Sequence, residues 1–255
     1  AGCLYAFSGF TVYNIFFNHF IDVVALFPYM LASLDDAVLD GKKGRFPFWV
    51  AVNLLNNYFF FAGQAVFLVI YFFCMLAGRA YKIGPRKFAT LAGETVLGCA
   101  LGCVLLLPAG LSLLQNPRTI DPFNGIGYLV YGKSQQYGAI FYSAFLMPDA
   151  PYFKDVFSEG ILKHTSLTAY LPVVGIAGGL AFCRGRRSHP FTYNLKVCIV
   201  CAFVPVLNSL FYALNSSYYA RWYYMPVLVL CGATASLLAR PNLARRELPR
   251  AWGLT

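Results

Sequence analysis

The sequence predicts an all-α fold, a polytopic transmembrane bundle of about seven membrane segments that forms a single domain over residues 1–255. Hydrophobic residues make up 59% of the chain and charged residues only 12%, whereas a soluble domain carries roughly a quarter charged residues. The mean hydropathy is +0.59. The apolar blocks between the charge clusters are long enough for helices that cross a bilayer.

The basic residues are not spread evenly. The net charge of +10 also occurs in nucleic-acid-binding proteins, but here Lys and Arg gather in short segments between apolar blocks, so we expect no nucleic-acid partner. This distribution follows the positive-inside rule and predicts that 41–45, 79–88, 184–189 and 240–255 are cytoplasmic. The near-neutral segment 114–164 is then an outer loop. A basic cytoplasmic face also suits anionic headgroups, which makes membrane lipids expected partners.

The first residues, Ala1 and Gly2, lie inside an apolar block without an initiator Met, so we expect an internal fragment of a longer protein. All eight cysteines lie within or at the ends of apolar blocks, and we predict packing roles for them rather than a disulfide framework.

His19 and Asp22 precede the first long apolar run. They are three residues apart, so both side chains can lie on one face of a helix. We expect this helix to run from Asp22 inward to about Leu39, with a kink at Pro28. An ionisable residue at a membrane boundary indicates a functional site. The alternative is that Asp22 only caps the helix that begins there.

The block 46–78 has basic segments on both sides, so it must cross outward and return. Its length of roughly 50 Å is too short for two full crossings of a core about 30 Å thick. We therefore predict a pair of short helices whose turn lies near Asn57 and Tyr58, below the outer boundary and facing the interior. The alternative for Asn and Gln side chains in this block is hydrogen bonding between helices.

The next predicted segment runs outward from Phe88 to about Leu113. It contains Glu94, which we expect to pair with a Lys or Arg of a neighbouring loop rather than to act in catalysis. Small residues at four positions suit close helix packing: Gly93, Gly98, Ala100 and Gly102. The outer loop that follows is rich in aromatic residues, which predicts short interfacial helices resting on the membrane.

Three more segments complete the predicted bundle, at 165–183, 191–214 and 222–239, followed by a cytoplasmic tail over 240–255. The corner before the last segment places Arg221 among five aromatic residues. One interpretation is an interfacial aromatic belt with an arginine that reaches to the headgroups. The other is an anion site for a lipid phosphate, since a guanidinium matches phosphate oxygens as a fork.

Several stretches resemble one known family. The sequences YAFSGFTVYNIFFNHFIDVVALFPYML, NLLNNYFFF, VIYFF and SSYYARWYYMPVLVL, in this order, are similar to the YfhO family of bacterial membrane proteins, which belongs with the GT-C glycosyltransferases. The resemblance covers nearly the whole chain.

The resemblance implies a multi-pass enzyme of the bacterial cell membrane. Such an enzyme transfers a sugar from a polyprenyl-phosphate donor to a cell-surface polymer such as lipoteichoic acid on the outer face. The family's principal catalytic Asp lies in a first outer loop, which we expect upstream of Ala1. By position, Asp22 matches a second acidic residue of these enzymes, so Asp22 and His19 are the catalytic candidates, with Asp22 binding a divalent metal ion or orienting the acceptor. Arg221, Asn57 and Tyr58 are the substrate-binding candidates.

A transporter or flippase of lipid-linked substrates is the alternative function. Such a protein typically shows inverted repeats and paired broken helices. The sequence has no clear internal repeat, but the short hairpin in 46–78 keeps this alternative open.

Overall fold

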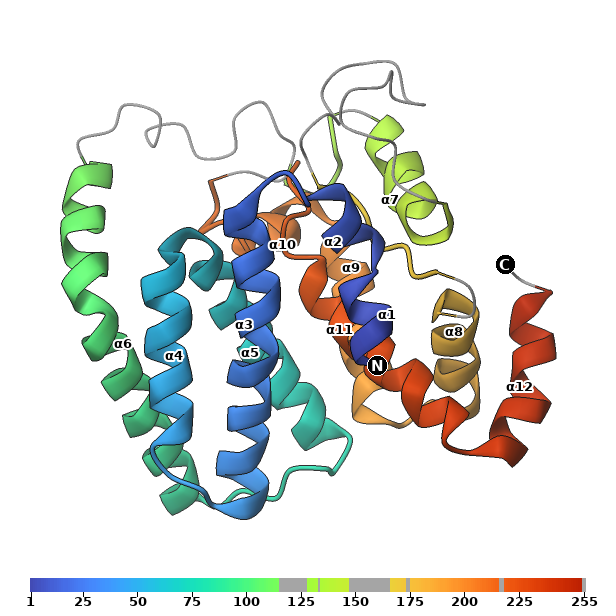
Figure 1. Cartoon of the computed structure of the whole chain (residues 1–255), viewed down its shortest axis with the longest axis horizontal. Coiled ribbons are helices and arrows are strands. Elements are labelled where there is room, and N and C mark those ends of the chain that lie inside the picture. The colour runs from blue at the N-terminus through green and yellow to red at the C-terminus, as the bar shows by residue number, and fades with distance from the viewer. Residues whose placement is uncertain (115–127, 133, 147–165, 173–174, 216–217, 254–255) are drawn as a thin grey trace.

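The structure is a computed structural model that describes residues 1–114, 128–132, 134–146, 166–172, 175–215 and 218–253. Every regular element in this part of the chain is helical, which confirms the all-α prediction (Figure 1). The elements are α1 (Gly2–Ala6), α2 (Gly9–Tyr13), α3 (Asn18–Asp35), η1 (Asp36–Asp40), α4 (Arg45–Asn56), α5 (Tyr58–Ala77), α6 (Pro85–Leu114), α7 (Gln135–Phe145), α8 (Gly175–Gly185), α9 (Pro190–Phe203), α10 (Pro205–Leu210), α11 (Tyr224–Leu238) and α12 (Pro241–Trp252).

The helices run between two ends of the molecule. One end carries the connections 41–44, 78–84, 186–189 and 239–240, and we call it the basic end (Figure 1). The start of α3, the α4–α5 turn and α10 lie at the opposite end, which we call the corner end. The basic segments between helices therefore gather at one end, as the positive-inside pattern requires, while the orientation in a membrane stays a prediction.

Among the described residues, two helices are long and apolar enough to cross a membrane: α5 and residues 85–112 of α6. Helix α6 lies at the edge of the bundle, and its outward side chains are apolar and exposed, with Val104 at 83% and Val96 at 69%. An exposed apolar face of this length fits contact with lipid. Helices α8, α9 and α11 have 11, 14 and 15 residues and are shorter than a bilayer core requires. The number of seven membrane segments therefore stays a prediction.

The block 46–78 forms two helices with a turn at Asn57, as predicted, but only α4 is short, and the prediction of a short second helix is wrong for α5. Helix α4 has 12 residues and ends at Asn56, and α5 has 20 residues and begins at Tyr58. Between them Asn57 is extended, with φ −159°. Asn53 is buried, but its amide donates to the carbonyl of Trp49 in its own helix. The alternative of hydrogen bonding between helices is thus wrong for Asn53.

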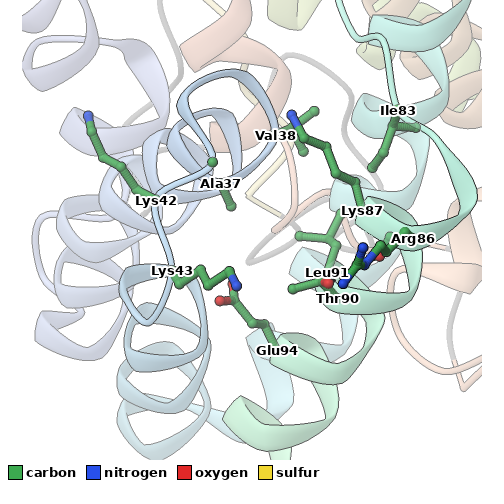
Figure 2. Close-up of a pocket in the computed structure, with 11 residues that line it drawn as sticks. Ala37, Val38, Lys42, Lys43, Ile83, Arg86, Lys87, Thr90, Leu91 and Glu94 are labelled. Atoms are coloured by element: carbon green, nitrogen blue, oxygen red, sulfur yellow. Dashed lines mark hydrogen bonds between the residues drawn. The ribbon is translucent and has the colours of Figure 1, made fainter.

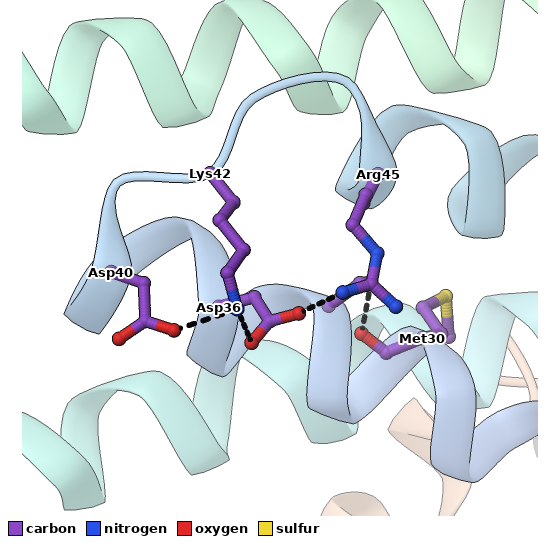
Figure 3. Close-up of polar contacts among 6 residues, drawn as sticks. Met30, Asp36, Asp40, Lys42 and Arg45 are labelled. Atoms are coloured by element: carbon purple, nitrogen blue, oxygen red, sulfur yellow. Dashed lines mark hydrogen bonds and ion pairs between the residues drawn. The ribbon is translucent and has the colours of Figure 1, made fainter.

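Helix α3 begins four residues before Asp22, continues through Pro28 and passes into the π-helical turn η1. Ion pairs fix this turn at the basic end: Asp36 contacts Lys42 at 3.1 Å and Arg45 at 2.6 Å (Figure 3). Just before it, Asp35 accepts hydrogen bonds from the hydroxyls of Tyr71 and Tyr81. The contacts of Asp36 join η1 to the following loop and to α4, and those of Asp35 join the end of α3 to α5 and to the connection after it.

The packing of α4 against α6 confirms two of the four small-residue predictions. A Cβ on Gly98 would lie 2.7 Å from the carbonyl oxygen of Pro47, and one on Gly102 would lie 2.1 Å from Leu54 Cδ2. Gly93 has no neighbouring atom within 4 Å of such a Cβ, and Ala100 is exposed, so the prediction is wrong for these two.

The predicted segment 191–214 is not one helix. Helix α9 ends at Phe203, Val204 is extended, and Pro205 begins α10. Proline fixes its own φ and disfavours a helical residue before it, which accounts for the break.

Helix α8 contacts α11 closely: Thr234 donates its hydroxyl to the carbonyl oxygen of Gly175 at 2.9 Å.

Most of the predicted outer loop lies outside the described residues. Its described part includes α7 at the corner end (Figure 1). The aromatic residues of this loop were expected to rest on the membrane. For Tyr131 this expectation is wrong, because it is 3% exposed and its hydroxyl donates to the carbonyl oxygen of Ala202 at 2.8 Å. The predicted tail forms helix α12, which packs against α8 and buries Glu247 beside Arg184 and Arg246.

All eight cysteines are free thiols. Four of them are buried, as the predicted packing role requires: Cys74, Cys198, Cys201 and Cys231.

Candidate functional site

The start of α3 carries the two catalytic candidates. Phe17 precedes the helix, no side chain caps it, and its first turn contains no acidic residue. The alternative that Asp22 is a helix cap is therefore wrong. His19 and Asp22 lie within one helix, three residues apart, and both are exposed, so they share one face as predicted.

The described residues of the corner between α10 and α11, 211–215 and 218–223, position Arg221. Asn208 accepts a hydrogen bond from the indole of Trp222 and donates to the carbonyl oxygen of Tyr219 at 3.1 Å. The ring of Trp222 stacks on Phe211, with centroids 3.9 Å apart. The backbone amide of Arg221 donates to the hydroxyl of Tyr212 at 2.6 Å. These contacts fix the backbone on both sides of the arginine.

The guanidinium of Arg221 lies over two aromatic rings, at 4.3 Å from the centroid of Tyr219 and 5.4 Å from that of Phe20. Its Nε is buried without a partner, and among the described residues the guanidinium makes no hydrogen bond or ion pair. Cation–π contacts hold the charge in place but leave its N–H donors unused. Such a group is suited to bind an anion.

Phe20 is the residue that connects the candidates. Its ring lies 4.8 Å from the ring of His19 and 4.8 Å from that of Phe60, and it carries the guanidinium of Arg221. Nothing in the local sequence singles out this phenylalanine, because its role depends on a corner about 200 residues away. Only its position beside His19 hints at it.

Asp22 is not part of the cluster of side chains around Phe20. Phe20 and Asp22 are two residues apart, which is roughly 200° around a helix, so they point to opposite sides. Phe20 is buried and Asp22 is exposed, and within the described residues no ion pair joins Asp22 to Arg221. The space beneath Arg221 has a volume of about 10 Å³, room for no more than a water molecule. Asp22 and His19 do not line it.

Asn57 and Tyr58 lie at the α4–α5 turn, and both are half-buried. The side-chain oxygen of Asn57 accepts a hydrogen bond from the amide of Phe60 at 3.3 Å, so Asn57 caps α5. The ring of Phe60 contacts that of Phe20, so the α4–α5 turn is joined to the side chains around Phe20. A substrate-binding role for Asn57 and Tyr58 stays a prediction.

The described residues contain no group of three or more His, Cys, Asp or Glu side chains arranged to hold a metal ion. His19 and Asp22 share one helical face and are only two side chains of ligand type. A divalent ion at Asp22 stays a prediction, and it needs further ligands from elsewhere.

Comparison with known proteins gives one match. A family model described as bacterial membrane protein YfhO matches residues 1–251. No curated protein and no solved structure matches the chain. Because the match covers nearly the whole sequence, the chain belongs to the YfhO family of bacterial membrane proteins.

Proposed function

We propose that this chain is part of a multi-pass GT-C-type glycosyltransferase of the bacterial cell membrane. It uses a polyprenyl-phosphate-linked sugar and transfers the sugar to a cell-surface polymer, such as lipoteichoic acid, on the outer face. The observation that carries the proposal is the guanidinium of Arg221, which Tyr219 and Phe20 hold at the corner end and which has no anionic partner among the described residues.

Arg221 binds the phosphate of the lipid donor in this proposal. A guanidinium presents its N–H groups as a planar fork that matches phosphate oxygens. The fixed position matters because the phosphate is also the leaving group. A preorganised cation stabilises the negative charge that develops on it as the sugar is transferred.

His19 and Asp22 act on the acceptor side of the reaction. His19 precedes Phe20 by one residue, Asp22 follows it by two, and both side chains are exposed on α3. They are therefore within reach of the corner that carries Arg221, and they do not neutralise its charge. The first-loop Asp expected upstream takes the proton of the acceptor hydroxyl, while Asp22 orients that hydroxyl or helps to bind a metal ion and His19 assists from the same face of α3. Asn57 and Tyr58 contact the sugar from the α4–α5 turn.

The alternative of a transporter or flippase has weaker support. Broken helices in transporters typically place the substrate near the middle of the membrane. Here both breaks, between α4 and α5 and between α9 and α10, lie toward the corner end (Figure 1).

The test is sugar transfer by the full-length protein in membranes. Arg221→Ala should lower kcat/KM for the donor about tenfold or more, the scale of a lost hydrogen bond to a charged group. Arg221→Lys should restore part of this loss, because it supplies a charge without the fork. Arg187→Ala, at an exposed arginine of the basic end, is the matched control and should leave transfer unchanged. Full donor use by Arg221→Ala contradicts the proposal.

A further inference from the structure

A second cavity lies at the basic end, far from the candidate site. It has a volume of about 310 Å³ and lies between the loop after η1 and the first turns of α6. Figure 2 shows Lys42 and Lys43 on one side of it and Arg86, Lys87 and Glu94 on the other. The walls therefore come from segments about 45 residues apart in the sequence, and four of the lining residues are basic.

The positive charge in this cavity is only partly neutralised. Lys42 is engaged by Asp36 at 3.1 Å and by Asp40 at 2.8 Å (Figure 3). Lys43, Arg86 and Lys87 make no ion pair with any described residue. Glu94 is the acidic residue of the lining, and it accepts a hydrogen bond from the backbone amide of Gly44 at 3.1 Å. Three free cations against one carboxylate leave an excess of two positive charges.

An apolar groove continues from the basic cavity. Leu91 lines both of them. The groove has a volume of about 440 Å³ and runs between α3, α4, α5 and α6. Three large apolar side chains of its lining are exposed, Phe73 at 61%, Val96 at 69% and Phe88 at 52%, so the groove opens to the surface. A charged cavity joined to an open apolar groove has the polarity pattern of an amphiphile.

We propose that this cavity and groove bind an anionic glycerophospholipid of the inner leaflet. Lys43, Arg86 and Lys87 bind the phosphate and headgroup, and an acyl chain lies along the groove past Phe88. Charge complementarity selects a negative headgroup over a zwitterionic one. The continuity through Leu91 selects a lipid over a water-soluble phosphate, which would leave the exposed apolar lining uncovered.

The site also explains why Glu94 lies in the cavity without forming an ion pair. By holding Gly44 it fixes the loop that carries Lys43. The carboxylate thereby keeps the two halves of the cavity together and leaves the three cations to the ligand. This proposal is independent of sugar transfer, because its cavity lies at the basic end, whereas Arg221 contacts Phe20 near the start of α3 at the corner end (Figure 1).

The test measures lipid retained by the purified full-length protein after reconstitution into phosphatidylcholine vesicles with and without phosphatidylglycerol. Native mass spectrometry counts the bound lipids. Phosphatidylglycerol should be retained in preference to phosphatidylcholine. The double variant R86Q/K87Q should weaken its binding about ten- to thirtyfold, since each basic residue contributes roughly a factor of five to anionic lipid binding. The control R187Q/R245Q removes two exposed positive charges that line neither the cavity nor the groove, and it should retain the lipid.

A third variant separates a lipid from a free phosphate. Ala92 lines the groove and is exposed, so Ala92→Trp blocks the acyl chain and leaves every charge in place. This variant should lose phosphatidylglycerol, and glycerol phosphate should compete poorly with the lipid for the unchanged protein. Equal retention of the two lipids overturns the proposal, as does an R86Q/K87Q variant that behaves like its control. Strong glycerol phosphate binding that survives Ala92→Trp shows a site for a soluble phosphate and also overturns it.

Discussion

The hydroxyl of Tyr5 donates a hydrogen bond to the carbonyl oxygen of Val24 at 3.2 Å. Val24 lies four residues before Pro28, so its carbonyl is the one that loses its helical partner, because proline has no N–H. Tyr5 is 8% exposed and Val24 5%, which keeps water away from both groups. A side chain of α1 thus satisfies the backbone group that Pro28 leaves open inside α3.

Tyr5→Phe should therefore lower the free energy of unfolding by about 1–3 kcal/mol, the cost of an unsatisfied buried carbonyl. In a Pro28→Ala background the same change should cost less, because alanine restores the helical N–H donor to Val24. Thermal unfolding in detergent measures the cycle. Tyr29→Phe, at an exposed tyrosine of α3, is the control. Equal costs in both backgrounds would show that the hydroxyl does not substitute for the missing donor.

The close approach of α4 and α6 predicts a contrast between glycines of one helix. Gly98→Ala and Gly102→Ala should each destabilise the protein by about 1–3 kcal/mol, because the new methyl group overlaps Pro47 or Leu54. Gly93→Ala has open space and should be neutral or stabilising by up to about 1 kcal/mol, the gain in helix propensity. Unfolding temperatures measure all three. If the three variants behave alike, the helices do not touch at these positions.

The cap of α9 should make stability depend on pH. His189 precedes α9, and its Nδ1 accepts a hydrogen bond from the amide of Phe191 at 3.2 Å. Burial lowers the pKa of His189, and Arg186 and Arg240 lower it further. The unfolded chain therefore binds the proton more readily than the folded protein. Stability is full above pH 6.5, the ordinary pKa, and falls as the pH drops through it toward the lowered value.

His189→Asn keeps an acceptor at the cap and removes the titration. Its free energy of unfolding should match the unchanged protein near pH 7 and exceed it near pH 5. Unfolding curves at the two pH values give the comparison. A variant with the same loss of stability on acidification as the unchanged protein would assign that loss to other groups.

How far the sequence predicted the fold depends on how local each signal was. The one-residue turn at Asn57 was predictable, since it follows from the length of 46–78 and the two basic loops beside it. The gathering of basic loops at one end followed from the charge pattern alone. The break at Val204 was missed, although Pro205 was visible, because a proline within a long apolar block is compatible with a kink as well as with a break.

The candidate site was only partly predictable for a different reason. The pairing of His19 and Asp22 is a matter of helical spacing, so one sequence suffices. The contact between Phe20 and Arg221 joins segments about 200 residues apart, and no periodicity reveals it. The same limit applies to Glu94, for which a basic partner was expected. Its bond is to the backbone amide of Gly44, a partner that sequence does not distinguish.

The two interpretations of Asp22 give opposite expectations for stability and for sugar transfer. If it capped α3, its replacement would cost about 0.5–2 kcal/mol of stability. The helix begins at Asn18 and its first turn contains no acid, so Asp22→Asn should leave the unfolding temperature and membrane insertion unchanged. In the full-length protein it should reduce sugar transfer about a hundredfold, the scale of losing a positioned acid or base.

The control for this variant is Asp40→Asn, which removes an exposed carboxylate at the basic end and should leave transfer intact. His19 and Asp22 share one exposed face of α3, so we also expect an effect at His19. If both act on the acceptor, His19→Gln should reduce transfer as well, and the double variant should lose less than the product of the two single losses, since residues that act as a unit are not additive. Full transfer by Asp22→Asn would remove Asp22 from the proposed mechanism, and multiplicative losses would show that the two residues act separately.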